Sequence, residues 1–122
     1  MPKILIVDDE RISLALVKFG LKAEDYEVIT ARDGEEGLKK VKKEKPDLIV
    51  LDIMMPNING YEFMGELKQL EIEKIPPVFI LTAHKKLKDV FKMENIQGYF
   101  VKPVNMTLFV SEIKACLESS SS

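Results

Sequence analysis

The chain has 122 residues, of which 46% are hydrophobic and 31% are charged, and its formal net charge is -2. These values are typical of one globular domain and exclude a wholly disordered chain. A net charge this small gives no indication of the strongly basic surface that binds nucleic acid directly. The longest apolar runs have only the length of strands, and the first residues lead directly into one of them. We therefore expect a cytoplasmic protein without a membrane segment.

Short apolar runs without polar alternation recur along the chain, at residues 3–7, 48–51, 78–81 and 98–101. Such runs predict strands that are buried on both faces, as in a parallel sheet covered by helices. Residues 26–30 predict a further strand, which Glu27 makes partly exposed. Between the strands the apolar residues change to helical spacing.

The first helix is expected from residue 12 to about residue 22. Its apolar residues at i, i+3, i+4 and i+7 predict one stripe of an amphipathic helix, the kind that faces a core: Ile12, Ala15, Leu16 and Phe19. The last helix is expected to be capped by Asn105 and to turn a similar stripe inward. A short helix containing Leu87 and Phe91 is expected before the last strand.

Strand and helix therefore alternate five times. This order predicts an α/β fold of the flavodoxin-like class, a doubly wound parallel sheet with helices on both faces and right-handed crossovers. We expect one domain over residues 1–118, followed by a disordered serine tail or linker stub at 119–122. The single cysteine, Cys116, excludes an internal disulfide and is expected to be a small apolar residue of the last helix.

Carboxylates follow two of the predicted buried strands: Asp8 and Asp9 come after the first, and Asp52 after the third. In the strand order 2-1-3-4-5 these two strands are neighbours, so the carboxylates meet at the edge where open α/β sheets bind ligands. A pair of like charges 4 Å apart costs about 4 kcal/mol at an effective dielectric constant near 20. Either one carboxylate takes a proton, or a hard divalent cation, Mg²⁺ or Mn²⁺, lies among them.

The other strand ends carry groups that suit phosphoryl transfer. Thr82 offers a hydroxyl donor, and Lys102 offers a cation. An aspartate carboxylate can act as a nucleophile that forms an acyl phosphate, while a metal and an ammonium group hold the phosphoryl oxygens. In this hypothesis Asp52 attacks, Asp8 and Asp9 hold the metal, and Thr82 and Lys102 each bind a phosphoryl oxygen.

Four segments together carry a family resemblance, which extends from Lys3 to about Leu117. They are Ile-Val-Asp-Asp-Glu at 6–10, Leu-Asp-Ile-Met-Met-Pro at 51–56 leading to Asn59-Gly60, Leu-Thr-Ala at 81–83, and Tyr-Phe-Val-Lys-Pro at 99–103. With these segments the chain resembles a response-regulator receiver domain of two-component or phosphorelay signalling. The resemblance implies the chemotaxis-regulator-like fold with strand order 2-1-3-4-5.

The resemblance also implies roles for residues of the site. Asp52 would accept a phosphoryl group from a histidine kinase or phosphotransfer protein. Mg²⁺ would be bound by Asp9, Asp52 and the backbone carbonyl of Met54, with Asp8 supporting the site largely through water. Thr82 and Lys102 would bind phosphoryl oxygens.

Further roles implied by the resemblance concern the switch. Lys102-Pro103 matches a cis peptide position, for which an X-Pro bond is well suited. Thr82 would move toward the phosphoryl group and Tyr99 would rotate inward behind it, which shifts the output face formed by the helix near residue 90, the last strand and the last helix. Met54 and His84 occupy the positions that tune phosphoryl lifetime, and neither supplies a carboxylate or amide for an attacking water.

Two segments depart from the family's pattern. Asn59 stands where the family often has Asp, which alters loop hydrogen bonding only. Residues 93–98 replace the usual turn rich in alanine and glycine, so the helix before them is expected to be short or irregular.

Three other functions fit parts of the pattern. A flavin-binding protein would have a loop rich in Ser, Thr and Gly after the first strand, where this chain has acidic residues. A metal-dependent phosphohydrolase commonly has a second acid two residues after the nucleophile, where this chain has Met54. A receiver-like interaction module would take no phosphate.

We therefore expect a switch rather than an enzyme acting on an external substrate. The output protein or effector domain is not identified by the sequence, and neither is the choice between a stand-alone regulator and part of a longer protein. The sequence is compatible both with a monomer and with a phosphorylation-dependent dimer.

Overall fold

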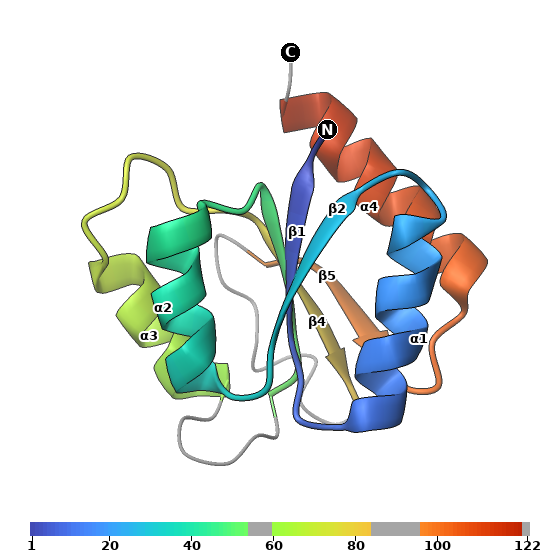
Figure 1. The fold of residues 1–122 in the computed structure, drawn as a ribbon, viewed down its shortest axis with the longest axis horizontal. Coiled ribbons are helices and arrows are strands. Elements are labelled where there is room, and N and C mark those ends of the chain that lie inside the picture. The colour runs from blue at the N-terminus through green and yellow to red at the C-terminus, as the bar shows by residue number, and fades with distance from the viewer. Residues whose placement is uncertain (54–59, 84–95, 121–122) are drawn as a thin grey trace.

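The computed structural model describes residues 1–53, 60–83 and 96–120 (Figure 1). In chain order, the elements are β1 (Lys3–Val7), α1 (Arg11–Lys22), β2 (Glu27–Ala31), α2 (Gly34–Glu44), β3 (Leu48–Leu51), α3 (Gly60–Gln69), β4 (Val78–Thr82), β5 (Ile96–Val101) and α4 (Met106–Ser120). The label α4 therefore belongs to the last helix. The short helix expected around residue 90 lies outside the described residues.

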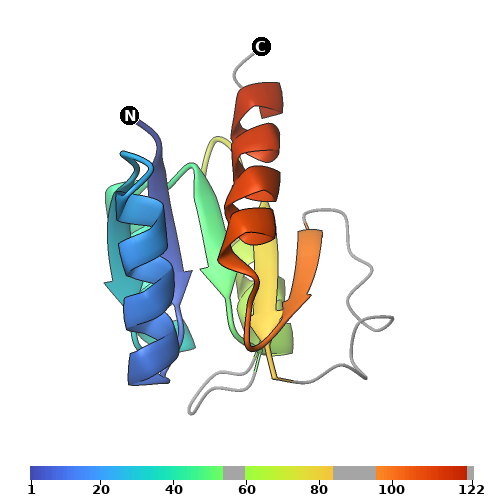
Figure 2. The ribbon, with the colours of Figure 1, turned by 90° about the vertical axis from the view of Figure 1, so that its right-hand side faces the viewer.

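The five strands form one sheet in the order β2-β1-β3-β4-β5, with every neighbouring pair parallel. The predicted fold class and strand order are therefore confirmed. Helices α1 and α4 cover one face of the sheet, and α2 and α3 cover the other (Figures 1 and 2). The central strands β1, β3 and β4 are almost completely buried, as their uninterrupted apolar sequences predicted.

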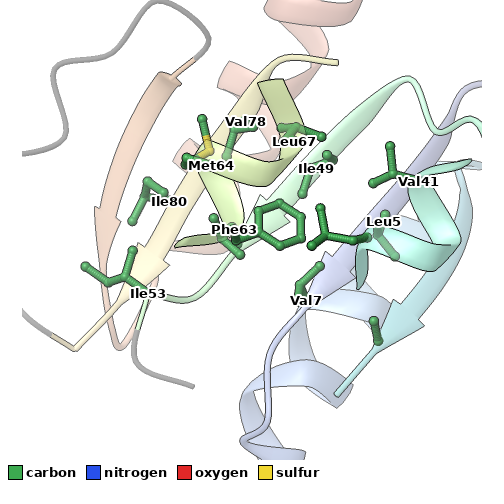
Figure 3. Close-up of a cluster of buried hydrophobic side chains, with 13 residues drawn as sticks. Leu5, Val7, Val41, Ile49, Ile53, Phe63, Met64, Leu67, Val78 and Ile80 are labelled. Carbon is green, nitrogen blue, oxygen red and sulfur yellow. The ribbon is translucent and has the colours of Figure 1, made fainter. Parts of the chain in front are cut away.

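Each face of the sheet has its own hydrophobic core, because successive side chains of a strand point to opposite faces. On the α2 and α3 side, Phe63 and Met64 pack against side chains of the central strands, such as Leu5 and Ile49 (Figure 3). On the α1 and α4 side, Phe109 packs against strand residues. Its ring meets that of Phe100 edge to face, with ring centroids 5.0 Å apart. The two cores hold the central strands rigidly from both sides.

Helix α1 turns the opposite side inward from the one predicted. Its buried residues are Ser13, Val17 and Leu21. The residues of the predicted core-facing stripe are all exposed, and the three large ones have exposed fractions of 74% (Ile12), 61% (Leu16) and 77% (Phe19). The prediction was wrong because α1 carries apolar residues on two sides, and their period does not say which side meets the sheet.

The remaining differences concern element ends. Strand β5 begins two residues earlier than expected, and β2 is shifted by one residue. Helix α4 continues to Ser120, past the expected domain boundary at 118. The cap of α4 is confirmed, since the backbone N-H of Leu108 donates a 3.1 Å hydrogen bond to Asn105 Oδ1. Shifts of one or two residues are ordinary at the ends of helices and strands.

The two sides of α1 can be compared by the same substitution. Leu21 is fully buried and Leu16 is 61% exposed. We expect Leu21→Ala to lower the free energy of unfolding by about 2–5 kcal/mol, because it leaves a cavity. Leu16→Ala is expected to change it by less than about 0.5 kcal/mol. Urea unfolding measures both, and a larger loss for Leu16→Ala would contradict the observed orientation.

Candidate functional site

Asp8 and Asp52 extend two neighbouring strands by one residue at the carboxyl edge of the sheet. The backbone N-H of Asp52 donates a 2.9 Å hydrogen bond to Val7 O, and that of Asp8 donates a 3.0 Å bond to Ala31 O. The residue pairing of β1 with β3 ends at Val7 and Leu51, directly before the two aspartates. Both aspartates are buried, with exposed fractions of 3% for Asp8 and 6% for Asp52. The strand ladder therefore fixes two carboxylates side by side.

A third carboxylate completes an acidic cluster. Asp9 is exposed, and one oxygen each from Asp8, Asp9 and Asp52 lie within 4.8 Å of one another. The backbone N-H of Glu10 donates a 2.9 Å hydrogen bond to Asp8 Oδ1, which orients that carboxylate. An all-oxygen donor set of this kind fits Mg²⁺ or another hard divalent cation, and it does not suit zinc.

Lys102 directly follows β5, the edge strand of the sheet, and brings a cation into this cluster. Its Nζ lies 3.0 Å from Asp8 Oδ2 and 3.2 Å from Asp52 Oδ2. A third carboxylate, that of the exposed Glu10, lies 3.5 Å away. The backbone N-H of Lys102 donates a 2.8 Å bond to Thr82 O, which ties the end of β5 to the end of β4. The ammonium group therefore stands between the two buried carboxylates and offsets their repulsion.

The balance of forces on Lys102 keeps its ammonium group charged. Partial burial disfavours the charge, but the hydrogen bond to Asp8 and the attraction of Asp52 and Asp8 outweigh that effect. Together they raise the pKa of Lys102 above its ordinary value of 10.5. The site therefore holds a permanent cation at neutral pH.

Thr82 and Tyr99 lie on the two strands beside this cation. Thr82 is the last residue of β4 and is fully buried. It pairs with Val101, and Tyr99 pairs with Ile80, so Thr82 and Tyr99 lie on the same face of the sheet. Tyr99 is half-buried and packs against the core on the α2 and α3 side. The peptide bond between Lys102 and Pro103 is cis, as the sequence implied.

The structure thus brings Asp8, Asp9, Asp52 and Lys102 together, and it places Thr82 at the same edge of the sheet. Met54 and His84 lie outside the described residues. Sequence reasoning gave Glu10 no role, although it contacts Lys102. The only available signal was its place as the third acid in the run after β1.

A parallel α/β sheet with carboxylates and a lysine gathered at its carboxyl edge defines a site for a cation and an anionic group. The chain belongs to the response regulator receiver domain family, whose model matches residues 4–114. It is thus the type of domain through which response regulators of two-component systems receive their signal. Among the described elements, no helix has both the length and the apolar character needed to cross a membrane.

Curated relatives are transcriptional regulators. The alkaline phosphatase synthesis transcriptional regulatory protein PhoP of Bacillus subtilis is 42% identical over 120 residues, which cover 97% of this chain and 49% of that protein. The transcriptional regulatory protein PrrA of Mycobacterium tuberculosis is 36% identical over 118 residues, which cover 95% of this chain and 50% of that protein. The chain therefore spans about half the length of these relatives.

Solved structures agree with the family assignment. The response regulator TrrA from Thermotoga maritima, in complex with Mg²⁺-BeF, is 36% identical with a TM-score of 0.84, and the match covers 95% of this chain and 99% of that one. A CheY-like receiver domain protein from Methanospirillum hungatei is 31% identical with a TM-score of 0.88, and the match covers 99% and 97%. The similarity therefore extends over almost the whole chain.

Removing the cation tests its structural role. We expect Lys102→Met, measured without divalent metal, to lower the free energy of unfolding by about 2 kcal/mol, because two buried carboxylates lose their counter-charge. Since the pKa of Lys102 is raised in the folded protein, this difference is fully present below the ordinary value of 10.5 and is lost as the pH rises through the folded value.

Urea unfolding of both proteins, near neutral pH and in the alkaline range, measures this difference. Lys43→Met, at an exposed position of α2, is the control and should show almost no difference from wild type. A Lys102→Met difference that stays constant through the alkaline range would contradict the assigned role.

Proposed function

We propose that Asp52 is the residue that accepts the phosphoryl group in this receiver domain, with a phosphohistidine protein as the donor. The observation that carries the proposal is the position of Lys102 Nζ, 3.2 Å from Asp52 Oδ2 beside a cluster of three carboxylates. An ammonium group held at that distance can pair with a phosphoryl oxygen once Asp52 carries an acyl phosphate. The domain then acts as a signalling switch rather than as an enzyme on an external substrate.

In the proposed transfer, an Asp52 carboxylate oxygen attacks the phosphorus atom of phosphohistidine. The new O-P bond forms as the N-P bond breaks, and the electron pair of that bond returns to the imidazole nitrogen, which takes up a proton. Lys102 and the hydroxyl of Thr82 bind two phosphoryl oxygens and stabilise their charge as it redistributes. The buried position of Asp52 limits the directions from which a donor can approach.

Asp9 and Asp52 would hold Mg²⁺, with Asp8 supporting the site and the backbone carbonyl of Met54 as a further ligand. Mn²⁺ has the same preference for oxygen donors and is expected to substitute. When bound, the cation neutralises negative charge on the carboxylates and on the phosphoryl oxygens. Lys102 contributes a single positive charge beside three carboxylates, so it offsets only part of their negative charge. This imbalance and the all-oxygen donor set support binding of a second cation.

Thr82 and Tyr99 are the proposed switch residues. Their place on one face of neighbouring strands supports coupling, because a shift of the Thr82 hydroxyl toward the phosphoryl group vacates space on the side where Tyr99 packs. The rotated ring would change the surface around β5, and with it the affinity for an output domain or protein. Since the named relatives are transcriptional regulators, we propose an output of that kind in a longer protein or a partner.

Adduct formation tests the acceptor directly. With Mg²⁺ and phosphoramidate, wild type is expected to gain the mass of one phosphoryl group, and with beryllofluoride it should show a change in its NMR spectrum. Asp52→Asn is expected to show neither, because an amide is not a nucleophile here. Asp25→Asn is the matched control: Asp25 is exposed with φ 67°, a conformation that Asn tolerates, so labelling should be unchanged.

The absence of an adduct on wild type, or an equal adduct on Asp52→Asn, would contradict the proposed acceptor. The domain would then be an interaction module that takes no phosphate. Removal of Mg²⁺ by a chelator is expected to abolish labelling of wild type, and Mn²⁺ is expected to restore it.

The lifetime of the phosphorylated form is a separate prediction. Met54 and His84, at the two tuning positions, supply no carboxylate or amide to orient an attacking water. We therefore expect an aspartyl phosphate that is not unusually short-lived. Decay of the labelled protein after removal of phosphoramidate measures it. Decay faster than that of receivers with acid or amide side chains at both positions would show this expectation to be wrong.

A further inference from the structure

The contact between Glu10 and Lys102 has no part in the proposed transfer. An ammonium group has three N-H donors, and three carboxylate oxygens lie around that of Lys102. They are Asp8 Oδ2 at 3.0 Å, Asp52 Oδ2 at 3.2 Å and Glu10 Oε1 at 3.5 Å. Each donor of Lys102 therefore has an acceptor. A phosphoryl oxygen that pairs with this ammonium group has to take the place of one of them.

Burial distinguishes the three acceptors. The side chains of Asp8 and Asp52 are 3% and 7% exposed, whereas that of Glu10 is 61% exposed. Separating Lys102 from a buried carboxylate leaves a charge without compensation in a poorly solvated place, which is costly. The exposed carboxylate of Glu10 is instead hydrated as soon as it moves away, so its contact with Lys102 is easily broken. Glu10 is therefore the partner that Lys102 exchanges most readily.

The local structure around Glu10 favours this contact. Glu10 is the N-cap residue of α1, but within the described part of the chain its side chain makes no capping hydrogen bond. Its backbone N-H donates a 2.9 Å hydrogen bond to Asp8 Oδ1, and its carboxylate approaches the ammonium group that binds the other oxygen of Asp8. The backbone of Glu10 is thus fixed by an aspartate of the site, and its side chain reaches over to the cation.

The charge of Glu10 opposes the phosphoryl group that the proposed function brings to Asp52. Transfer changes a carboxylate with one negative charge into an acyl phosphate with about two. The added charge and the carboxylate of Glu10 lie near the same ammonium group, about 6 Å apart or less. Like charges at this distance change an affinity by roughly three- to tenfold at an effective dielectric constant of about 40 to 80. Glu10 therefore competes with the phosphoryl group for Lys102 and also repels it.

We propose that Glu10 is a positioning residue that holds Lys102 in the unphosphorylated protein and is displaced from it by the phosphoryl group. This inference rests on the proposed function of Asp52. Lys102 exchanges one carboxylate oxygen for a phosphoryl oxygen, and the released carboxylate of Glu10 enters solvent. Through its charge, Glu10 lowers the affinity of the site for a phosphoryl-like anion and raises its affinity for a divalent cation.

Glu10→Gln tests the competition, because it removes the charge and keeps the shape of the side chain. With saturating Mg²⁺, we expect beryllofluoride to bind this variant about three- to tenfold more tightly than wild type in an NMR titration. Without beryllofluoride, Mg²⁺ is expected to bind the variant more weakly by a similar factor. Glu73→Gln is the matched control: Glu73 is exposed in the segment before β4, at the opposite edge of the sheet, so both affinities should change less than about twofold.

The position of Lys102 is measured separately through the NMR signals of its side chain, assigned with Lys102→Arg. In protein free of anion, Glu10→Gln is expected to increase the mobility of Lys102 Cε and Nζ, whereas Glu73→Gln should leave it unchanged. Addition of beryllofluoride to wild type is expected to shift the signal of the Glu10 carboxyl carbon, because that carboxylate leaves the ammonium group. The measurement on anion-free protein reports the contact without relying on phosphorylation.

The other outcomes separate this inference from the function on which it rests. An unchanged or weaker affinity of Glu10→Gln for beryllofluoride would overturn it, and so would an unchanged mobility of Lys102 or a Glu10 signal that does not respond to the anion. A lower unfolding temperature of Glu10→Gln, with neither affinity changed, would assign Glu10 to the dipole of α1 alone. If wild type binds no beryllofluoride, although Glu10→Gln loosens Lys102, the proposed acceptor is overturned and with it the displacement of Glu10.

Discussion

The contact between Lys102 and two buried aspartates is the interaction on which the site depends. Asp8 and Asp52 are held side by side by the hydrogen bonds of neighbouring strands, so their charges cannot move apart. Lys102 Nζ lies 3.0 Å and 3.2 Å from their oxygens and offsets the repulsion. A buried cluster of this kind is costly to desolvate, and it is kept in proteins where its charges have a use. In the proposed function, an incoming phosphoryl group pairs with Lys102 while a divalent cation binds the carboxylates.

The sheet makes this arrangement possible because both of its faces are covered. Phe63 on one side and Phe109 on the other pack against central strands that have almost no exposed surface. Strands held from both sides deliver their end residues with little freedom, which a reactive constellation requires. Strand β5 is only half-buried, so Tyr99 lies where a change in its environment can reach the surface. In the proposed function, the buried central strands carry the reacting groups, and Tyr99 on the more exposed β5 transmits the change to the surface.

Sequence reasoning was most successful where one local signal had a single structural meaning. An apolar run of strand length followed by Asp52 indicated a buried strand and a carboxylate at its end, and both were found. It failed for α1, where Leu16 and Leu21 belong to different sides of one helix and both sides are apolar. Helical period identifies a stripe but does not say what covers it. The contact between Glu10 and Lys102 was also missed, since it joins residues far apart in the chain.

The sequence by itself determined the alternation of strands and helices, the residue types at the strand ends and the family. These features follow from local periodicity and from short motifs. Only the tertiary structure decided which side of α1 faces the sheet, and how close Lys102 comes to Asp8 and Asp52. The physical reason is that both depend on packing between distant segments. Burial of Val17 and Leu21 against the sheet leaves Leu16 on the exposed side of α1. The meeting of β1, β3 and β5 at one edge sets the distances of the site.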